Sequence, residues 1–246
     1  MTVKKHILFL AAFLCIGAGF AEKHEIVFVA EDGTSFKQIF DNSDKYLVVN
    51  AKKFSTKKIA KIEGVENFSE TENVCFYSLR YTGNYNFLKM LPNLKSLGLM
   101  NCWISSLDFL ENLYNLEDAE IHFTADTSKY DEIKEQKVDL RKLTKLKKIY
   151  VEGSDFCEIY EKKPWESSVA QRMDFIPKFV NVQNKPELMI DNNRIEKISK
   201  EEIKLLKQYS KVSLDSNPIA KNRAELLKLK KAKINFSARP MPERNL

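Results

Sequence analysis

The chain has 246 residues, of which 43% are hydrophobic and 30% are charged, and its formal net charge is +6. This length and composition are typical of one globular domain. Without the two lysines near the N-terminus the charge falls to about +4, too little to indicate a nucleic-acid-binding protein. The seven glycines of the whole chain argue against a phosphate-binding loop.

The first 21 residues have the layout of a secretory signal peptide. Two lysines precede an apolar run over residues 7–16, and small residues follow up to Ala21. The run is too short for a comfortable membrane span, which takes roughly 20 apolar residues. We therefore expect cleavage after about Ala21, a mature chain without a membrane span, and a secreted, periplasmic or cell-surface location. Lipid attachment at Cys15 is the alternative, although Leu14 stands where a small residue would be expected.

Residues 22–90 contain apolar residues that alternate as in β-strands, but the spacing between strands is irregular. Ile26 and Phe28 are expected to open the sheet as a cap. Two irregular coils follow, one with Leu47, Val49 and Phe54, and one with Val74, Phe76, Tyr81 and Asn84.

A regular repeat begins at Leu91. Leu97 and Leu99 alternate as strand residues do, and Leu107 and Leu110 recur at the spacing of a tight helical turn. A strand followed by a helical return is one coil of a solenoid. The repeat places apolar residues at offsets 0, +2, +7 and +10 and a small or polar residue at +5, and it recurs from Ile149, from Leu188 and, as far as +7, from Val212.

The repeat is interrupted between these coils. Ala119 and Ile121 lie 22 residues after Leu97 and Leu99, but the rest of their coil is irregular. Extra residues enter near 124–137, and a longer insertion with Pro164, Trp165 and Pro177 occupies 160–185. Insertions into a solenoid usually form loops on one side.

The C-terminal part predicts two helices and a last strand. Ser199 and Glu202 form a capping-box sequence before a helix over 200–209. A second helix is expected over 222–231. The inward-facing residues of the two helices are predicted to be Ile203, Leu205, Leu206, Leu226, Leu227 and Leu229. Ile234 lies 22 residues after Val212, so Ile234 and Phe236 are expected to form the final strand.

Three cysteines follow the leader, namely Cys75, Cys102 and Cys157. Three cannot all pair within one chain, and their spacing matches no zinc site. We interpret each as a small buried apolar residue.

The pattern L-x-x-L-x-L-x-x-N/C-x-L resembles leucine-rich repeats, especially the short bacterial repeats of about 22 residues found in internalins. The resemblance is strong over 91–121 and 186–219 and fair over 143–159. It implies an α/β solenoid, an arc with a parallel β-sheet on its concave face and short helices or turns on its convex face. Asn193, Asn217 and Cys102 occupy the turn position whose side chain bonds free backbone groups in the interior.

The resemblance also implies a single domain over residues 22–246 that follows the leader at 1–21. This domain would comprise irregular N-terminal coils over 22–90, regular coils over 91–219 with the insertions near 124–137 and 160–185, and a C-terminal cap over 220–246.

In such a solenoid the strand residues between the buried ones point into the concave hollow, because side chains alternate across a strand. Tyr77, Met100, His122 and Tyr150 would form a stripe of residue types that are enriched at interface centres. Acidic residues would flank the stripe and suit a partner with a basic patch. The candidate binding residues are Tyr77, Met100, Asp118, Glu120, His122, Lys148, Tyr150, Glu152, Met189 and Asp191. The same rule places Asn73, Cys75, Ser96, Gly98, Glu187, Lys211, Ser213 and Asp215 on this face.

These features favour a non-catalytic monomer that binds a protein partner through its concave face. Ordinary solvated strand residues are the alternative interpretation of the same positions. A structural or inhibitory, immunity-type envelope protein is the second functional class, and an enzyme is a distant third. The sequence has no nucleophile motif near His122 and no histidine pair at metal spacing, so we expect no catalytic residue, metal, cofactor or nucleic-acid partner.

Overall fold

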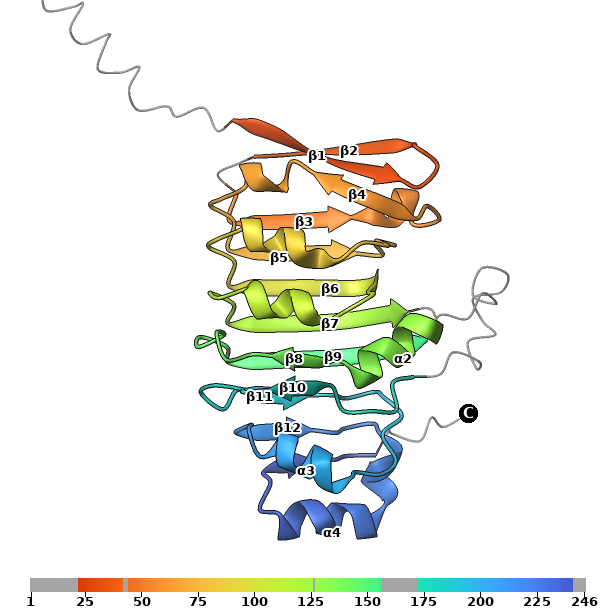
Figure 1. The fold of residues 1–246 in the computed structure, drawn as a ribbon, viewed down its shortest axis with the longest axis vertical. Coiled ribbons are helices and arrows are strands. Elements are labelled where there is room, and N and C mark those ends of the chain that lie inside the picture. The colour runs from red at the N-terminus through yellow and green to blue at the C-terminus, as the bar shows by residue number, and fades with distance from the viewer. Residues whose placement is uncertain (1–21, 42–43, 126, 156–171, 241–246) are drawn as a thin grey trace, which may run out of the picture.

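The fold is a stack of strands joined by short helical returns (Figure 1). The structure is a computed structural model that describes residues 22–41, 44–125, 127–155 and 172–240. The proposed leader lies outside these residues, as do Cys157, Pro164 and Trp165.

An eight-stranded sheet runs along most of the stack, and every neighbouring pair of its strands is parallel. The strands are adjacent in chain order, from β3 at one end to β13 at the other. They are β3 (Tyr46–Asn50), β5 (Asn73–Tyr77), β6 (Ser96–Trp103), β7 (Asp118–Ala125), β9 (Lys148–Asp155), β11 (Glu187–Met189), β12 (Lys211–Ser213) and β13 (Phe236–Ser237). This is the α/β solenoid with a parallel sheet that the repeat predicts.

The register of this sheet confirms the shared offsets of the repeat. Leu97 pairs with Ala119, Ala119 with Ile149, Ile149 with Leu188, and Leu188 with Val212. All five are buried, and they belong to one hydrophobic core that extends from Ile26 to Leu229. A single coil could not bury its own apolar face, so each coil depends on its neighbours for a core.

Short helices lead from one strand to the next on one side of the sheet (Figure 1). They are η1 (Ala51–Phe54), η2 (Val65–Asn67), η3 (Tyr85–Met90), η4 (Asp108–Asn112), α2 (Thr127–Glu135), α3 (Lys200–Leu206), η6 (Pro218–Lys221) and α4 (Arg223–Lys231). Asn50 and Asn84 begin η1 and η3, because their side chains accept hydrogen bonds from the first-turn amides of Lys52 and Asn86. None of the helices in the described ranges is long and apolar enough to cross a membrane.

Buried asparagines satisfy the backbone where the chain turns between strand and return. Asn217 Nδ2 donates to Ile190 O at 2.8 Å and to Leu214 O at 3.2 Å, and its Oδ1 accepts from Ile195 N at 2.9 Å. Asn193 makes equivalent bonds one coil earlier in the chain. Its amide joins Val151 O at 3.0 Å and Gly153 N at 3.1 Å.

Cys102 stands in the same position of an earlier coil and donates its thiol to Phe76 O at 3.3 Å. The role predicted for the turn position is therefore confirmed for Asn193, Asn217 and Cys102. Cys102 is buried as expected, whereas Cys75 is only half-buried, because it alternates along β5 with the buried Val74 and Phe76.

The N-terminal cap is a separate antiparallel sheet, so the expectation that Ile26 and Phe28 open the main sheet is wrong. β1 (Lys23–Ala30) lies between β2 (Ser35–Asp41) and β4 (Ile59–Glu63). Both residues are buried and cover the open end of the core. A turn through Gly33 joins β1 directly to β2 and makes the pairing antiparallel.

The insertion near 124–137 forms the nine-residue helix α2 instead of a loop. Tyr130 and Ile133, three residues apart on one helix face, are buried in the core. β8 (Lys137–Asp139) follows it and pairs in parallel with β10 (Lys178–Val180), which belongs to the second insertion.

The C-terminal cap follows the prediction with three differences. Ser199 and Glu202 form the capping box, but α3 ends at Leu206 and not at 209. In α4, Leu229 is buried and Leu226 packs against the core, whereas Leu227 is 44% exposed. The last strand pairs Phe236 with Val212, two residues later than expected. Ile234 still belongs to the end of α4, because its amide bonds Leu229 O and Lys233 takes a positive φ.

Candidate protein-binding face

The face of the eight-stranded sheet away from the helical returns is called the open face here. Its side chains form three rows, because the strands are in register. The first row contains Tyr46, Asn73, Ser96, Asp118, Lys148, Glu187 and Lys211. The second contains Val48, Cys75, Gly98, Glu120, Tyr150, Met189 and Ser213, and the third contains Asn50, Tyr77, Met100, His122 and Glu152.

Nine of the ten candidate residues therefore share one face, as predicted, and Asp191 lies beyond the end of β11, outside the three rows. Tyr77, Asp118, Glu120 and Lys148 are exposed, and Met100, His122, Tyr150, Glu152, Met189 and Asp191 are half-buried.

A hollow of about 440 Å³ lies over the first two rows, between β3 and β9. Gly98 stands in its floor, where a Cβ atom would come within 2.8 Å of Cys75 Sγ. Since the second row has no side chain at this position, the surface is depressed between Cys75 and Glu120.

Exposed apolar side chains lie on β3 and β5 of the open face, and two of them, Tyr46 and Val48, line the hollow. Tyr46 is 69% exposed, Val48 53% and Tyr77 42%. Tyr46 and Val48 were absent from the predicted set. The alternation in Tyr46–Asn50 could have found them, since Leu47 and Val49 were already assigned to the core.

His122 is held by an aromatic ring and two carboxylates. Its ring stacks on that of Tyr150, with centroids 4.9 Å apart and planes 22° apart. Its Nε2 lies 3.0 Å from Glu120 Oε1 and its Nδ1 3.5 Å from Glu152 Oε2. The Tyr150 hydroxyl donates to Glu152 Oε2 at 2.9 Å. Burial and the neighbouring Glu152 carboxylate raise the pKa of Tyr150, so its hydroxyl stays protonated and remains a donor.

The register corrects the predicted stripe at one position. Tyr77, Met100 and His122 lie in one row, but Glu152 is the next member of that row, and Tyr150 pairs with Glu120 in the second row. The His122–Tyr150 contact is therefore diagonal between neighbouring strands.

The C-terminal end of the open face is closed by the last strand and the residues after it. Ser213 lies in the second row of this face, as predicted, but it is buried, and so is Asp215. Ser213 Oγ lies 3.1 Å from Ser237 Oγ, and Asp215 Oδ2 accepts from Arg239 Nε at 2.7 Å. Asp191 in turn accepts from the backbone amide of Asp215 at 2.8 Å.

Cys75 and His122 are the thiol and the imidazole of the open face. Burial raises the pKa of the Cys75 thiol, which keeps it protonated and a weak nucleophile at neutral pH. The polar neighbours of His122 are carboxylates that hold its ring in place. Among the described residues, no three His, Cys, Asp or Glu side chains gather closely enough to hold a metal ion.

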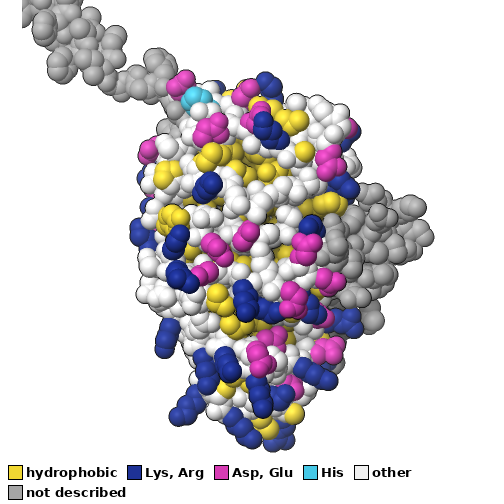
Figure 2. All heavy atoms as spheres, viewed as in Figure 1, with side chains coloured by type: hydrophobic (Ala, Val, Ile, Leu, Met, Phe, Trp, Pro, Cys, Tyr) yellow, Lys and Arg dark blue, Asp and Glu magenta, His cyan; other side chains and the backbone are white. Residues whose placement is uncertain are grey.

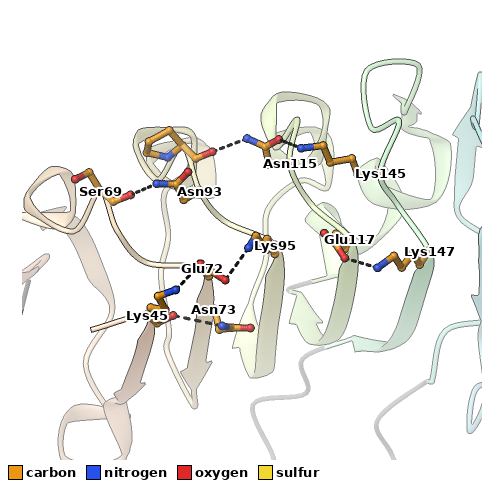
Figure 3. A network of polar contacts seen from close by, with 11 residues as sticks. Lys45, Ser69, Glu72, Asn73, Asn93, Lys95, Asn115, Glu117, Lys145 and Lys147 are labelled. Carbon is orange, nitrogen blue, oxygen red and sulfur yellow. Dashed lines mark hydrogen bonds and ion pairs between the residues drawn. The ribbon is translucent and has the colours of Figure 1, made fainter. Parts of the chain in front are cut away.

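Polar contacts tie successive coils together along the edge where the strands begin (Figure 3). Asn93 donates to Ser69 O at 2.9 Å and Asn115 to Pro92 O at 2.7 Å. Glu72 pairs with both Lys45 and Lys95, and Glu117 pairs with Lys147. Exposed pairs of this kind contribute little to stability, but they neutralise the lysines next to the open face.

No family model matches the chain, and no curated protein matches it. Among solved structures it is similar to the crystal structure of an internalin from Listeria monocytogenes, with 15% sequence identity and a TM-score of 0.30. The match covers 74% of this chain and 60% of the internalin chain, which is less than two thirds of that protein.

Proposed function

We propose that this protein binds another protein through its open face and does not catalyse a reaction. The observation that carries the proposal is the exposure of Tyr46, Val48 and Tyr77 on two neighbouring strands of the open face, where Tyr46 and Val48 line the hollow and Tyr77 lies in the third row. Large apolar side chains that lie together in solvent are a feature of recognition surfaces, and aromatic residues are enriched at interface centres.

The partner's chemistry follows from what surrounds these three residues. The hollow over Gly98 has room for one apolar or aromatic side chain of the partner. Asp118 and Glu120 border it and Glu152 lies beyond, so basic residues of the partner would face them. Lys148, in the first row, is the one basic residue among the described side chains that line the hollow. The proposal treats the chain as a monomer that needs no metal or cofactor for binding.

Site-specific photo-crosslinking tests the position of the interface. A photo-reactive amino acid at Val48 should yield a covalent adduct with the partner. At Tyr114, which is 51% exposed but not in the three rows of the open face, it should yield none. The Val48 adduct should be lost when Tyr77→Ala is added, because that change removes an apolar anchor. Equal adducts from both positions would contradict the proposal.

We also propose that the chain is exported after cleavage of its leader behind about Ala21. The two lysines, the apolar run and the small residues of the N-terminus support this proposal. Mass spectrometry of the exported protein should find an N-terminus at Glu22. An acylated Cys15 at the N-terminus would instead identify an anchored lipoprotein.

A further inference from the structure

The C-terminal end of the molecule differs in charge from the rest. Residues 194–240 contain 13 Lys and Arg against five Asp and Glu, a net charge of +8, whereas residues 22–193 contain 24 against 28. Figure 2 shows Lys and Arg side chains gathered over the lower end of the molecule, where α3 and α4 lie in Figure 1. The basic charge of the whole chain is therefore concentrated at one end.

Many of the cations at this end have no acidic partner, whereas many lysines in the rest of the described chain are paired. In the coils Lys37, Lys45, Lys57, Lys61, Lys95, Lys134, Lys147 and Lys178 each pair with a carboxylate. Within the described part of the chain, no carboxylate pairs with the exposed cations Lys200, Lys204, Lys207, Lys221, Arg223, Lys230, Lys231 and Lys233, called the basic end below. Their charge is free to act on a ligand.

On α4 an apolar residue stands in the centre of these cations. Leu227 is 44% exposed, although Leu229 two residues on is fully buried. Arg223, Lys230 and Lys231 lie four residues before it and three and four after it, so all three border it on the helix surface. α3 adds Lys200, Lys204 and Lys207 on one helix face at the same end.

We propose that the basic end docks the protein on an anionic phospholipid membrane surface. Lysines near such a surface attract its headgroups, and each strengthens binding about fivefold at low salt. Leu227 would enter the headgroup boundary, as the apolar residues of interfacial helices do. A nucleic acid fits less well, because single strands need exposed aromatic rings for base stacking. In residues 194–240 Tyr209 is buried and Phe236 is half-buried.

Co-sedimentation with vesicles tests this proposal. The mature chain, which begins at Glu22, should bind vesicles of phosphatidylcholine with phosphatidylglycerol, should not bind vesicles of phosphatidylcholine alone, and should lose binding as salt rises, because the screening length shortens. The triple variant Arg223→Gln/Lys230→Gln/Lys231→Gln should bind the anionic vesicles at least about tenfold more weakly. Leu227→Ala should weaken binding several-fold at every salt concentration.

A matched control removes the same charge elsewhere. Lys52→Gln/Lys53→Gln/Lys89→Gln changes three exposed lysines of the coils and should leave vesicle binding within about twofold of wild type. Thermal unfolding must be measured for the first triple variant, since Lys230 and Lys231 also favour the C-terminus of α4. The dependence of wild-type vesicle binding on salt and lipid tests the proposal even if the first triple variant is unfolded. Equal binding to both vesicle types, equal losses in both triple variants, or tighter binding to an oligonucleotide than to anionic vesicles would each overturn the proposal.

Discussion

Single side chains form the hydrogen bonds that buried backbone groups of this solenoid need. Where a coil turns from strand to return, backbone amides and carbonyls point inward and have no strand partner. Asn217 and Asn193 carry both a donor and an acceptor and can therefore serve several of these groups at once. Cys102 offers only a weak donor and serves fewer. The apolar core is continuous because these polar groups are paired within it.

Replacing Asn217 by Ala should destabilise the protein strongly. The change leaves the Ile195 amide and the carbonyls of Ile190 and Leu214 without this partner. Because each unsatisfied buried group costs about 1 to 3 kcal/mol, we expect a loss of about 2 to 4 kcal/mol in the free energy of unfolding. Urea denaturation measures it. Asn67→Ala, at an exposed position, is the control and should change stability by less than about 0.5 kcal/mol.

The Asp215–Arg239 pair makes the stability of the C-terminal end depend on pH. Burial raises the pKa of Asp215, but the hydrogen bonds and charge of Arg239 outweigh burial and lower this pKa below its usual value. The folded state thus favours the carboxylate, and its contribution is complete above the unfolded pKa and is lost as pH falls through the folded pKa. Asp215→Asn should lower the denaturation midpoint at neutral pH. The difference from wild type should shrink below about pH 4; a constant difference down to pH 2 would contradict the assignment.

At the scale of elements, the sequence predicts the strands whose positions depend on the repeated buried residues. Leu97, Ile149, Leu188 and Val212 have fixed neighbours at +2 and +5, so their strands and mutual register follow from the repeat. Elements outside the repeat cannot be predicted from its spacing. The insertion before Lys137 forms α2 because Tyr130 and Ile133 pack against the core. This packing is a tertiary effect, so the spacing of the repeat could not predict it.

The ends of the solenoid were harder to predict, because a terminal element has a neighbour on one side only. Leu227 is apolar but faces solvent, since α4 buries Leu229 and no element of the described residues covers its outer face. Ile234 fits the spacing of a strand but completes the end of α4. In the candidate site, alternation correctly placed nine of the ten candidate side chains on one face, all but Asp191. It could not give the closure of that face by Arg239, because this contact joins residues 24 positions apart at an irregular end.

Core truncations test the assignment of the buried rows. Leu99→Ala, Ile190→Ala and Leu214→Ala each remove a fully buried side chain and should cost about 2 to 5 kcal/mol through the cavity left behind. Leu99→Ala, in the middle of the sheet, should lower the free energy of unfolding more than Leu214→Ala near its end, because an interior coil is held by two full neighbours. Chemical denaturation gives the values. Val48→Ala, on the open face, should change stability by less than about 1 kcal/mol.

At the scale of the whole molecule, the two proposed surfaces are separate. The open face runs along the stack of strands, whereas α4 covers its C-terminal end (Figure 1). Membrane contact through the basic end would leave the open face accessible to a protein partner. The charges also differ, since Asp118, Glu120 and Glu152 stand on the open face and the basic end holds unpaired lysines. Variants of one surface should therefore leave binding at the other unchanged.

The kinetics of partner binding should separate the apolar and acidic parts of the open face. Met100→Ala/Tyr150→Ala removes the half-buried side chains on either side of His122 and should mainly speed dissociation, because apolar anchors govern release. Glu120→Lys/Glu152→Lys should mainly slow association, and this loss should shrink as salt rises, because the screening length is only about 8 Å at physiological ionic strength. Both pairs lie on solvent-facing rows, so circular dichroism should report an intact fold. Surface plasmon resonance with the partner identified by crosslinking gives the two rate constants, and wild-type rates in both double variants would move the interface off the central rows.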